Sequence, residues 1–446
     1  MRIKDKTEIL AFLLTWATAV CSQSWVTTAN GPGSNDEGSG ASAILLRQDI
    51  DIYNSPVRSP ENNRLSYNHP SCLDETDKGT IILCWNGGTS ESTRENRIYC
   101  TRRVAGSSTW SDPMMVEDGG QIDYGTVYQA RNVPDAPIIC GYWWGGCCWQ
   151  GSFRYSTDDG LTWSNRIECP TNPIWYQGPM TMGMNAPLEW PNGDLWFASY
   201  TYKAGDRPIN GEACITKVPH DNYTNEAGKT PWSGQNIQGG HADGHYMGTW
   251  LVLSPDYNEL MYIARTNFNQ GPYYAVSTDK GQTWTNDWPK AGGFGSNGIS
   301  GVSLDVDRPS SPLHGWHVST GGHHGTLRLA INVHVSNDPL NASSWVQKIQ
   351  LRKQEINNQD GENADPTVMQ SRDGSKVCVL FTGRGSHHLR YYEIDAYKLT
   401  GVSPNTTKAR STLAQSSSLV PNDGNGVLYS LQGRRLKNQP DKHRHI

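Results

Sequence analysis

Basic charge, long apolar runs and phenylalanine are all scarce in this sequence of 446 residues. Lys and Arg total 38 against 43 Asp and Glu, so no basic excess is available to neutralise a phosphate backbone, and nucleic acid is not expected as a partner. The longest apolar stretch, residues 9–16, is about half of the ~20 residues that cross a bilayer, so no membrane span is expected. Six Phe against 17 Trp and 20 Tyr, with 46 Gly, favour short strands and turns over long helical bundles.

Motifs of several enzyme classes are also absent. The sequence has no G-x-S-x-G elbow, no P-loop and no G-x-G-x-x-G after a predicted strand, so acyl transfer, nucleotide hydrolysis and nicotinamide chemistry have no support. No C-x-x-C pair is present, and the adjacent Cys147 and Cys148 have no second pair at zinc-ribbon spacing. Among enzymes, glycan chemistry is the class that remains.

The amino terminus has the layout of a secretory signal peptide. Three basic residues precede the apolar stretch, and Ala-Thr-Ala at 17–19 supplies small residues in A-x-A order. We therefore predict a signal peptide over residues 1–19 and an exported protein, either periplasmic, secreted or on the cell surface. A lipoprotein site at Cys21 is the alternative, although Val20 stands where such a site normally has Gly, Ala or Ser.

Nine cysteines remain in the body of the chain once Cys21 is set aside. They are scattered, unlike the dense framework of a small disulfide scaffold. Cys84 and Cys100 are predicted to face each other in a hairpin whose strands cover residues 80–85 and 97–102. Whether they form a disulfide is left open.

The most specific local signal is an internal repeat. Residues 156–163, S-T-D-D-G-L-T-W, return as residues 277–284, S-T-D-K-G-Q-T-W. The pattern S-x-D-x-G-x-T-W is the Asp box, in which Asp and Gly make a tight turn and Trp packs under it. Degenerate copies surround Trp110, Trp232 and Trp345, so the tryptophan spacings of 53, 69, 52 and 61 indicate a period near 59.

Each period reads as four short β-rich runs, which is the pattern of a propeller blade. The units start near residues 69, 126, 180, 240, 300 and 364, and one of them is expected to have strands at 125–130, 138–144, 151–156 and 161–167. The last unit lacks an outer strand, which residues 44–53 can supply to close the ring. We predict an all-β propeller of four-stranded antiparallel blades over residues 20–400, six by this count, followed by a carboxy-terminal tail over residues 401–446. A seventh blade within residues 24–68 or 163–232 stays open.

Polar residues at the ends of the innermost strands are candidates for chemistry, because propellers bind ligands over the central channel. Arginines from several blades suit a carboxylate-bearing sugar, since the planar guanidinium binds a carboxylate through two hydrogen bonds. A hydrogen-bonding role in a Gly-rich turn is the alternative for each residue. The predicted substrate-binding residues are His69, Arg131, His241, His245, Tyr246, Arg265 and Arg384.

The segment around His241 also has the spacing of metal ligands. His241, Asp243 and His245 alternate, so they hold a divalent metal only if a further ligand arrives from elsewhere in the fold. Metal content is therefore left open, and the predicted chemistry requires no cofactor. We expect the chain to act as a monomer.

The Asp boxes, the His69-Pro70 pair at a strand start and the segment 240–246 together resemble those of the bacterial-neuraminidase-repeat propellers. Within them the chain looks most like glycoside hydrolase family 145, α-L-rhamnosidases related in fold to the ulvan lyases. The similarity covers roughly residues 25–400. It implies a seven-bladed ring and removal of L-rhamnose linked α-1,4 to D-glucuronate on arabinogalactan. The expected partner is a uronate-containing plant or algal glycan.

The resemblance further implies a single histidine on the amino-terminal strand as the main catalytic group. The matching position in L-L-R-Q-D-I, residues 45–50, is Gln48. An imidazole exchanges a proton near neutral pH, whereas a carboxamide only hydrogen-bonds. Loss of general acid–base catalysis costs about 10²–10⁴-fold in rate, so the expectation is a rhamnosidase scaffold with weak or no turnover.

Three other functions stay open. A uronate lyase acting by β-elimination needs an Arg to neutralise the carboxylate and a His or Tyr to remove the C5 proton. By residue type Arg265 fits the first role, and His241, His245 and Tyr246 fit the second. A non-catalytic glycan-binding protein follows if Gln48 abolishes turnover. A sialidase shares the Asp boxes, but the Arg-Ile-Pro motif of that class is absent near the amino end.

Overall fold

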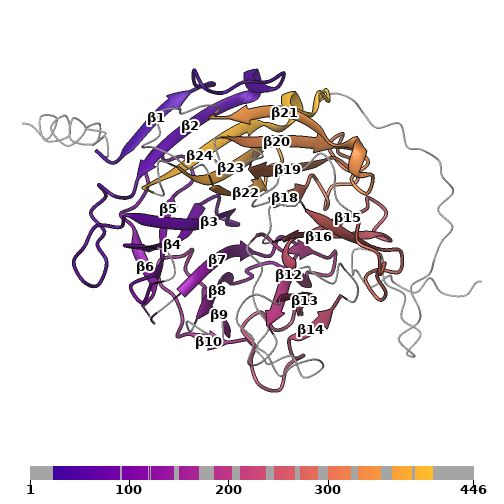
Figure 1. Ribbon diagram of the computed structural model, residues 1–446, viewed down its shortest axis with the longest axis horizontal. Coiled ribbons are helices and arrows are strands. Elements are labelled where there is room, and N and C mark those ends of the chain that lie inside the picture. Colours follow the sequence, from indigo (N-terminus) through magenta and orange to yellow (C-terminus); the bar gives the residue numbers. More distant parts are fainter. Residues whose placement is uncertain are drawn as a thin grey trace, which may run out of the picture.

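The computed structural model describes residues 24–404, apart from residues 91–92, 119, 121, 145–149, 170–184, 203–210, 238–245, 267–271, 290–299, 323–329, 353–363 and 384–386. The described residues form six antiparallel sheets around one central axis (Figure 1). The expected signal peptide and all but four residues of the expected tail lie outside them. None of the helices in this part of the chain is long and apolar enough to cross a membrane.

Each sheet is one blade, and in blades 1 to 5 the strands follow in chain order from the axis to the rim. Blade 1 contains β3 (Tyr67–Glu75), β4 (Ile81–Gly88), β5 (Arg97–Arg103) and β6 (Met114–Glu117). Blade 2 contains β7 (Ile122–Gln129), β8 (Ile138–Trp144), β9 (Gln150–Ser156) and β10 (Ile167–Glu168). Blade 3 contains β11 (Leu188–Glu189), β12 (Leu195–Tyr202), β13 (Gly211–Val218) and β14 (Ser233–Asn236). Blade 4 contains β15 (Tyr246–Leu253), β16 (Leu260–Thr266) and β17 (Tyr273–Ser277).

Blades 5 and 6 complete the ring, and the two chain ends meet in blade 6. Blade 5 contains β18 (Ser300–Ser303), β19 (His317–Gly322), β20 (Ile331–Ser336) and β21 (Val346–Leu351). Blade 6 contains β22 (Ala364–Gln370), β23 (Lys376–Gly383), β24 (His388–Asp395), β2 (Ile44–Asp51) and β1 (Val26–Asn30). Short helical turns lie at η1 (Ala41–Ala43), η2 (Ala342–Ser344) and α2 (Ala396–Thr400).

Closure of the ring by the amino-terminal strand is confirmed. β2 pairs antiparallel with β24, with Gln48 opposite Tyr391, and Figure 1 shows the indigo β1 and β2 beside the yellow-orange β24. The described residues form six blades, so the count from the repeat period is confirmed and the seven blades implied by the family resemblance are wrong. Residues 24–68, where a seventh blade stayed open, contribute their two long strands to blade 6 instead.

The innermost strands run in one direction along the central channel and so define two ends. His69, near the start of β3, contacts Asp365, near the start of β22. At the other end the Gln129 N–H, at the close of β7, donates to the Asp74 carboxylate near the close of β3, 2.7 Å away. We call the end where these strands begin the histidine end, and the end where they finish the Asp-box end.

The Asp boxes form the tight turns that the motif predicts, and they lie at the Asp-box end. Asp159 accepts hydrogen bonds from the Thr76 and Thr80 hydroxyls at 2.6 and 2.7 Å, in the turn that follows β3. In the second box, hydrogen bonds from the hydroxyl and N–H of Thr283 hold the pKa of Asp279 at about 2. The strand expected at 161–167 shrinks to β10, because the first of these residues belong to the Asp-box turn.

The periodic tryptophans pack between successive blades. Hydrophobic clusters of described residues lie at each of the six junctions between neighbouring blades. The repeat tryptophans reach these clusters in chain order, each toward the preceding blade: Trp110, Trp163, Trp232, Trp284 and Trp345. The period read from the sequence therefore follows from one tryptophan at each of five of these junctions, where large rings bury much apolar area.

The predicted hairpin pair of cysteines is also present. Cys84 on β4 lies directly opposite Cys100 on β5, as the sequence predicts. Both are free thiols in this structure. They pack with Cys72 and Cys140 in the cluster between blades 1 and 2, so these side chains act as small apolar core residues.

Two buried histidines in blade 5 are expected to make the fold sensitive to mild acid. Burial lowers the pKa of His317, which hydrogen-bonds the Leu253 carbonyl at 3.0 Å, from 6.5 to about 4, and burial lowers that of His334 equally. Below pH 6.5 the unfolded chain takes up protons that the folded chain does not, so stability present above pH 6.5 is lost as pH falls toward 4. The loss is about 3 kcal/mol for each histidine.

Urea unfolding between pH 6.5 and pH 4 measures this effect. The double variant His317→Gln with His334→Gln isolates it from carboxyl groups that titrate in the same range. Its free energy of unfolding is expected to change less with pH than that of the wild type, because glutamine does not titrate. If the free energy of unfolding changed equally with pH in the two proteins, these histidines would make no contribution to the pH dependence of stability.

Candidate functional site

The histidine end holds three polar side chains in contact, contributed by two adjacent blades. The Nε2 of His69, on β3, contacts the Oδ2 of Asp365, on β22. The Tyr67 hydroxyl lies 3.1 Å from the Nδ1 of His69, two residues back and therefore on the same face of β3. The imidazole is thus held at both nitrogens, between a phenol and a carboxylate.

Irregular backbone in both strands places these groups. The register of β3 shifts beside Pro70, which has no N–H to donate to a strand ladder. The register of β22 shifts between Ala364 and Thr367, and Asp365 within this bulge has a φ of 41°. This left-handed region is rare for a residue with a Cβ, and strained backbone of this kind clusters at functional sites.

The arrangement has the chemistry of an acid–base relay. The exposed fractions of the His69 and Asp365 side chains are 11% and 4%, so water weakens their interaction little. A carboxylate on one ring nitrogen fixes the tautomer and leaves the other nitrogen to accept a proton from the phenol. A base that is oriented by a third group in this way activates a hydroxyl as base or nucleophile.

The topology brings two further predicted residues to the same end. Tyr246 is the first residue of β15, and Arg265 lies opposite Met247 near the close of the antiparallel β16. Both positions are therefore at the end of the channel where His69 lies. The predicted residues His241, His245 and Arg384 lie outside the described residues. With them, the suggested ligands of the His241 metal site also lie outside.

Gln48 lies away from the channel, in the outer part of blade 6. Its side chain is 1% exposed, and its Oε1 accepts hydrogen bonds from Trp110 at 3.0 Å and Arg103 at 3.2 Å. Its Nε2 donates to the Thr28 hydroxyl at 2.9 Å. The carboxamide therefore makes hydrogen bonds on both sides within the protein, and these join blade 1 to the strands that close the ring.

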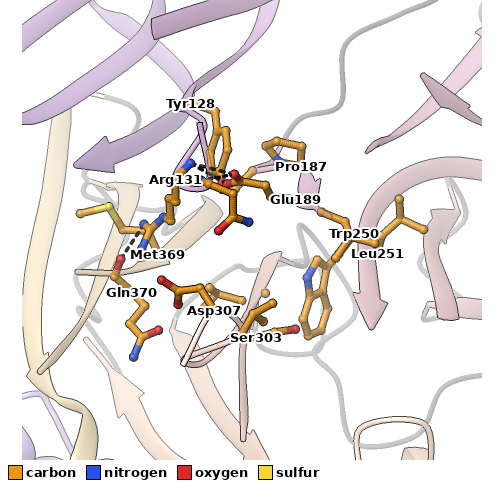
Figure 2. A pocket seen from close by; sticks show the side chains of 16 residues that line it. Tyr128, Arg131, Pro187, Glu189, Trp250, Leu251, Ser303, Asp307, Met369 and Gln370 are labelled. Atoms are coloured by element: carbon orange, nitrogen blue, oxygen red, sulfur yellow. Dashed lines mark hydrogen bonds between the residues drawn. The ribbon is translucent and has the colours of Figure 1, made fainter. Parts of the chain in front are cut away.

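Arg131 lies at the Asp-box end, beyond the close of β7, and so is not brought together with His69. It lines a cavity of about 90 Å³ in the channel, together with residues from blades 2 to 6. Its guanidinium donates to the Gln370 carbonyl at 2.7 Å and lies 3.5 Å from the Asp74 carboxylate. Figure 2 shows Arg131 and Glu189 on one side of this cavity and Asp307 and Ser303 on the other.

Glu189 is the buried acid of this cavity. Its carboxylate accepts the Tyr128 hydroxyl at 2.7 Å and the N–H groups of Arg131 and Asn132 at 2.8 and 2.6 Å. Burial raises the pKa of Glu189 in spite of these hydrogen bonds. The contacts join β11 to the turn after β7, so Glu189 also fixes blade 3 against blade 2.

Several of these residues were not found by sequence reasoning. Asp365, Tyr67 and Glu189 carry no motif, although position 365 opens an innermost strand at a unit start that the repeat period marks. Their importance comes from contacts between strands far apart in the sequence. Among the described residues, no group of three or more His, Cys, Asp or Glu side chains is placed to hold a metal ion.

Comparison with solved structures gives glycosidase propellers at low sequence identity. NanB sialidase from Streptococcus pneumoniae has 10% identity and a TM-score of 0.57, over 78% of this chain and 71% of that one. The leech intramolecular trans-sialidase has 12% sequence identity and a TM-score of 0.56, and the match covers 76% of this chain and 69% of that one. An α-L-arabinofuranosidase from Fusarium graminearum has 14% sequence identity and a TM-score of 0.53, and the match covers 79% of this chain and 98% of that one. At these identities the likeness shows the fold.

Sequence comparison identifies the family directly. No curated protein matches the chain. The model of the BNR repeat-like domain matches residues 79–379, which is more than half of the sequence and runs from blade 1 into blade 6. The two Asp boxes, the periodic tryptophans and the ring of blades all lie within or around this match, and the chain therefore belongs to the BNR repeat-like domain family.

Proposed function

We propose that this protein is a glycoside-cleaving enzyme whose reacting site is at the histidine end of the channel. The observation that carries the proposal is the contact of His69 with Asp365 on one nitrogen and with Tyr67 on the other. Membership of the BNR repeat-like domain family and a fold shared with a sialidase, a trans-sialidase and an arabinofuranosidase support a glycan as substrate.

The proposed substrate is L-rhamnose linked to D-glucuronate, as the resemblance to glycoside hydrolase family 145 implies. The resemblance implies a catalytic histidine near the amino end of the chain. His69 is such a histidine and lies at the histidine end of the channel, whereas Gln48 is buried in the outer part of blade 6. We therefore assign the histidine role to His69. Gln48 then places no limit on turnover.

The relay supplies the proton steps of hydrolysis. His69 accepts the proton of Tyr67, and the phenolate oxygen takes a proton from the attacking water as the bond from rhamnose to the glycosidic oxygen breaks. The relay then returns a proton to the glucuronate oxygen that leaves. One water is consumed for each rhamnose released, and the three side chains end in their starting protonation states.

A uronate lyase is the second candidate, because Arg265 and Tyr246 occupy strand positions at the same end as His69. In β-elimination the relay takes the C5 proton of the uronate, the C4–O bond breaks with its electrons leaving on oxygen, and no water is consumed. The product carries a double bond that absorbs ultraviolet light. Hydrolysis gives no such product.

Product analysis with wild-type protein tests the proposal. Rhamnose-capped arabinogalactan is incubated with the full chain, while free rhamnose and ultraviolet absorbance are followed in the same sample. We expect rhamnose to be released without a rise in absorbance. A rise in absorbance on a uronate polysaccharide, without rhamnose, would assign the lyase instead. Absence of both products on these glycans would refute both assignments.

A further inference from the structure

The cavity at the Asp-box end is separate from the proposed reacting site, since it lies where the innermost strands finish. It is lined by described residues from five blades, and its 90 Å³ corresponds to the volume of about three water molecules. A cavity of this size takes up part of one sugar ring with some of its hydroxyl groups, and the rest of the ring stays in solvent. Figure 2 shows Trp250 closing a third side of the cavity, between the Glu189 side and the Ser303 side.

We propose that this cavity binds one neutral sugar ring. Anions are disfavoured, because Arg131 is the one cationic side chain among the described residues of the lining, against Glu189 and Asp307. Arg131 is also already engaged by the Gln370 carbonyl and by Asp74, a further carboxylate. Arg131 therefore has few N–H groups left for a ligand carboxylate, and the Glu189 and Asp307 carboxylates of the lining would repel it.

Cations and apolar ligands fit less well than a polyhydroxyl ring. Both oxygens of Glu189 already accept hydrogen bonds from Tyr128 and from the N–H groups after β7, and Arg131 stands beside it on the same side. An apolar ligand would take water from Asp307 and Ser303 without replacing its hydrogen bonds, which is unfavourable. Sugar hydroxyls donate to a carboxylate and both donate to and accept from a hydroxyl, so a neutral sugar satisfies Asp307 and Ser303 without bringing a further charge.

Asp307 and Trp250 supply the remaining features of a sugar site. The Asp307 side chain is 49% exposed, and its nearest charged partner, Arg308 Nε, is 3.7 Å away, so its oxygens can accept ligand hydroxyls. Trp250 packs against Gly301, where an added Cβ would lie 2.3 Å from the indole ring. The missing side chain lets the indole lie close against β18, and the fixed ring offers an apolar wall to sugar C–H groups.

Saturation-transfer NMR with small glycosides tests this site. The probes are methyl β-D-galactopyranoside and methyl β-D-glucopyranoside, with L-lactate and choline as charged comparisons; none of the four is part of the substrate proposed for the histidine end. A neutral glycoside is expected to bind with a Kd of about 1 mM, which is typical for a ligand of this size. Asp307→Ala is expected to weaken binding about tenfold or more, because a charged acceptor is lost. Ser303→Met is expected to abolish it by filling the cavity.

Two control variants separate this site from the rest of the molecule. Asp112→Ala removes an exposed carboxylate outside the cavity and should leave binding unchanged. His69→Gln alters the opposite end of the channel and should also leave glycoside binding unchanged. Binding in the cavity is therefore tested separately from catalysis at the histidine end. Glycoside binding that survives both Asp307→Ala and Ser303→Met would overturn the proposal. So would preference for lactate or choline, or failure of both glycosides to bind.

Discussion

Replacing His69 by glutamine is expected to lower kcat for rhamnose release by about 10²–10⁴-fold, the usual cost of losing a general acid–base group. Glutamine retains a hydrogen bond to Asp365 or Tyr67 but has no proton to exchange near neutral pH. KM is expected to change little, because the side chain acts on the reaction and the substrate binds through other groups. Steady-state kinetics on rhamnose-capped arabinogalactan measures both constants.

Substitution of the other two relay members distinguishes a relay from a lone histidine. Tyr67→Phe removes the phenol that faces Nδ1, and Asp365→Asn removes the charge that fixes the tautomer. Each is expected to lower kcat, and the double variants should lose little more than His69→Gln alone, since the three groups act as a unit. Fully additive losses would contradict a shared relay.

Gln48→His is the matched control for the placement of the histidine. If the position aligned with the family histidine were the reacting one, this variant would gain turnover. We expect no gain, because the side chain is enclosed by Trp110, Arg103 and Thr28 in the outer part of blade 6. A gain of activity in this variant would instead move the site to β2.

Arg103→Met is expected to lower the free energy of unfolding by about 2–3 kcal/mol, the usual cost of losing a buried hydrogen bond to a charged group, because Lys376 still pairs with the Glu393 carboxylate at 2.7 Å. Arg103 on β5 contacts the Glu393 carboxylate on β24 and donates to Gln48 and Tyr391 at 3.2 Å. Its exposed fraction is 8% and that of Glu393 is 6%, so water cannot replace the lost hydrogen bonds. These contacts join blade 1 to the closing strands of blade 6.

Urea unfolding measures the loss, and two further variants identify its cause. Arg103→Met with Glu393→Gln is expected to be no more stable than Arg103→Met alone, because the second substitution also breaks the pair of Glu393 with Lys376 at 2.7 Å. Lys229→Met breaks an exposed ion pair with Glu226 and should leave the free energy of unfolding almost unchanged, because water screens this pair. If Arg103→Met lowered the free energy of unfolding no more than Lys229→Met does, the contacts of Arg103 with blade 6 would not be what holds the ring closed.

Much of the fold could be predicted from the sequence because its signals are local. The Asp box carries its own hydrogen bonds within a few residues, as in the contacts of Asp279 with Thr283, so the motif forms the same turn wherever it occurs. The spacing of the tryptophans reports the length of a blade, since each ring fills one junction. The repeat period therefore supported six blades, where family analogy supported seven.

The candidate site was less predictable because its parts come from distant strands. His69 was selected as a polar residue at a strand start, but its partner Asp365 lies almost 300 residues later and carries no motif. Arg131 was selected on the same grounds, yet it follows its strand and so lies at the opposite end of the channel. A one-dimensional pattern identifies residues near strand ends without stating which end of the ring they share.

The sequence by itself determined that the chain forms blades of short antiparallel strands and where the Asp-box turns lie. Those properties depend on residues within one period, where hydrogen bonding and aromatic packing act over short separations. Only the tertiary structure decided that Gln48 joins blades instead of facing a substrate, and that His69 meets Asp365 over the channel. Both outcomes depend on how the two ends of the chain come together, because closing the ring places the first strands beside the last.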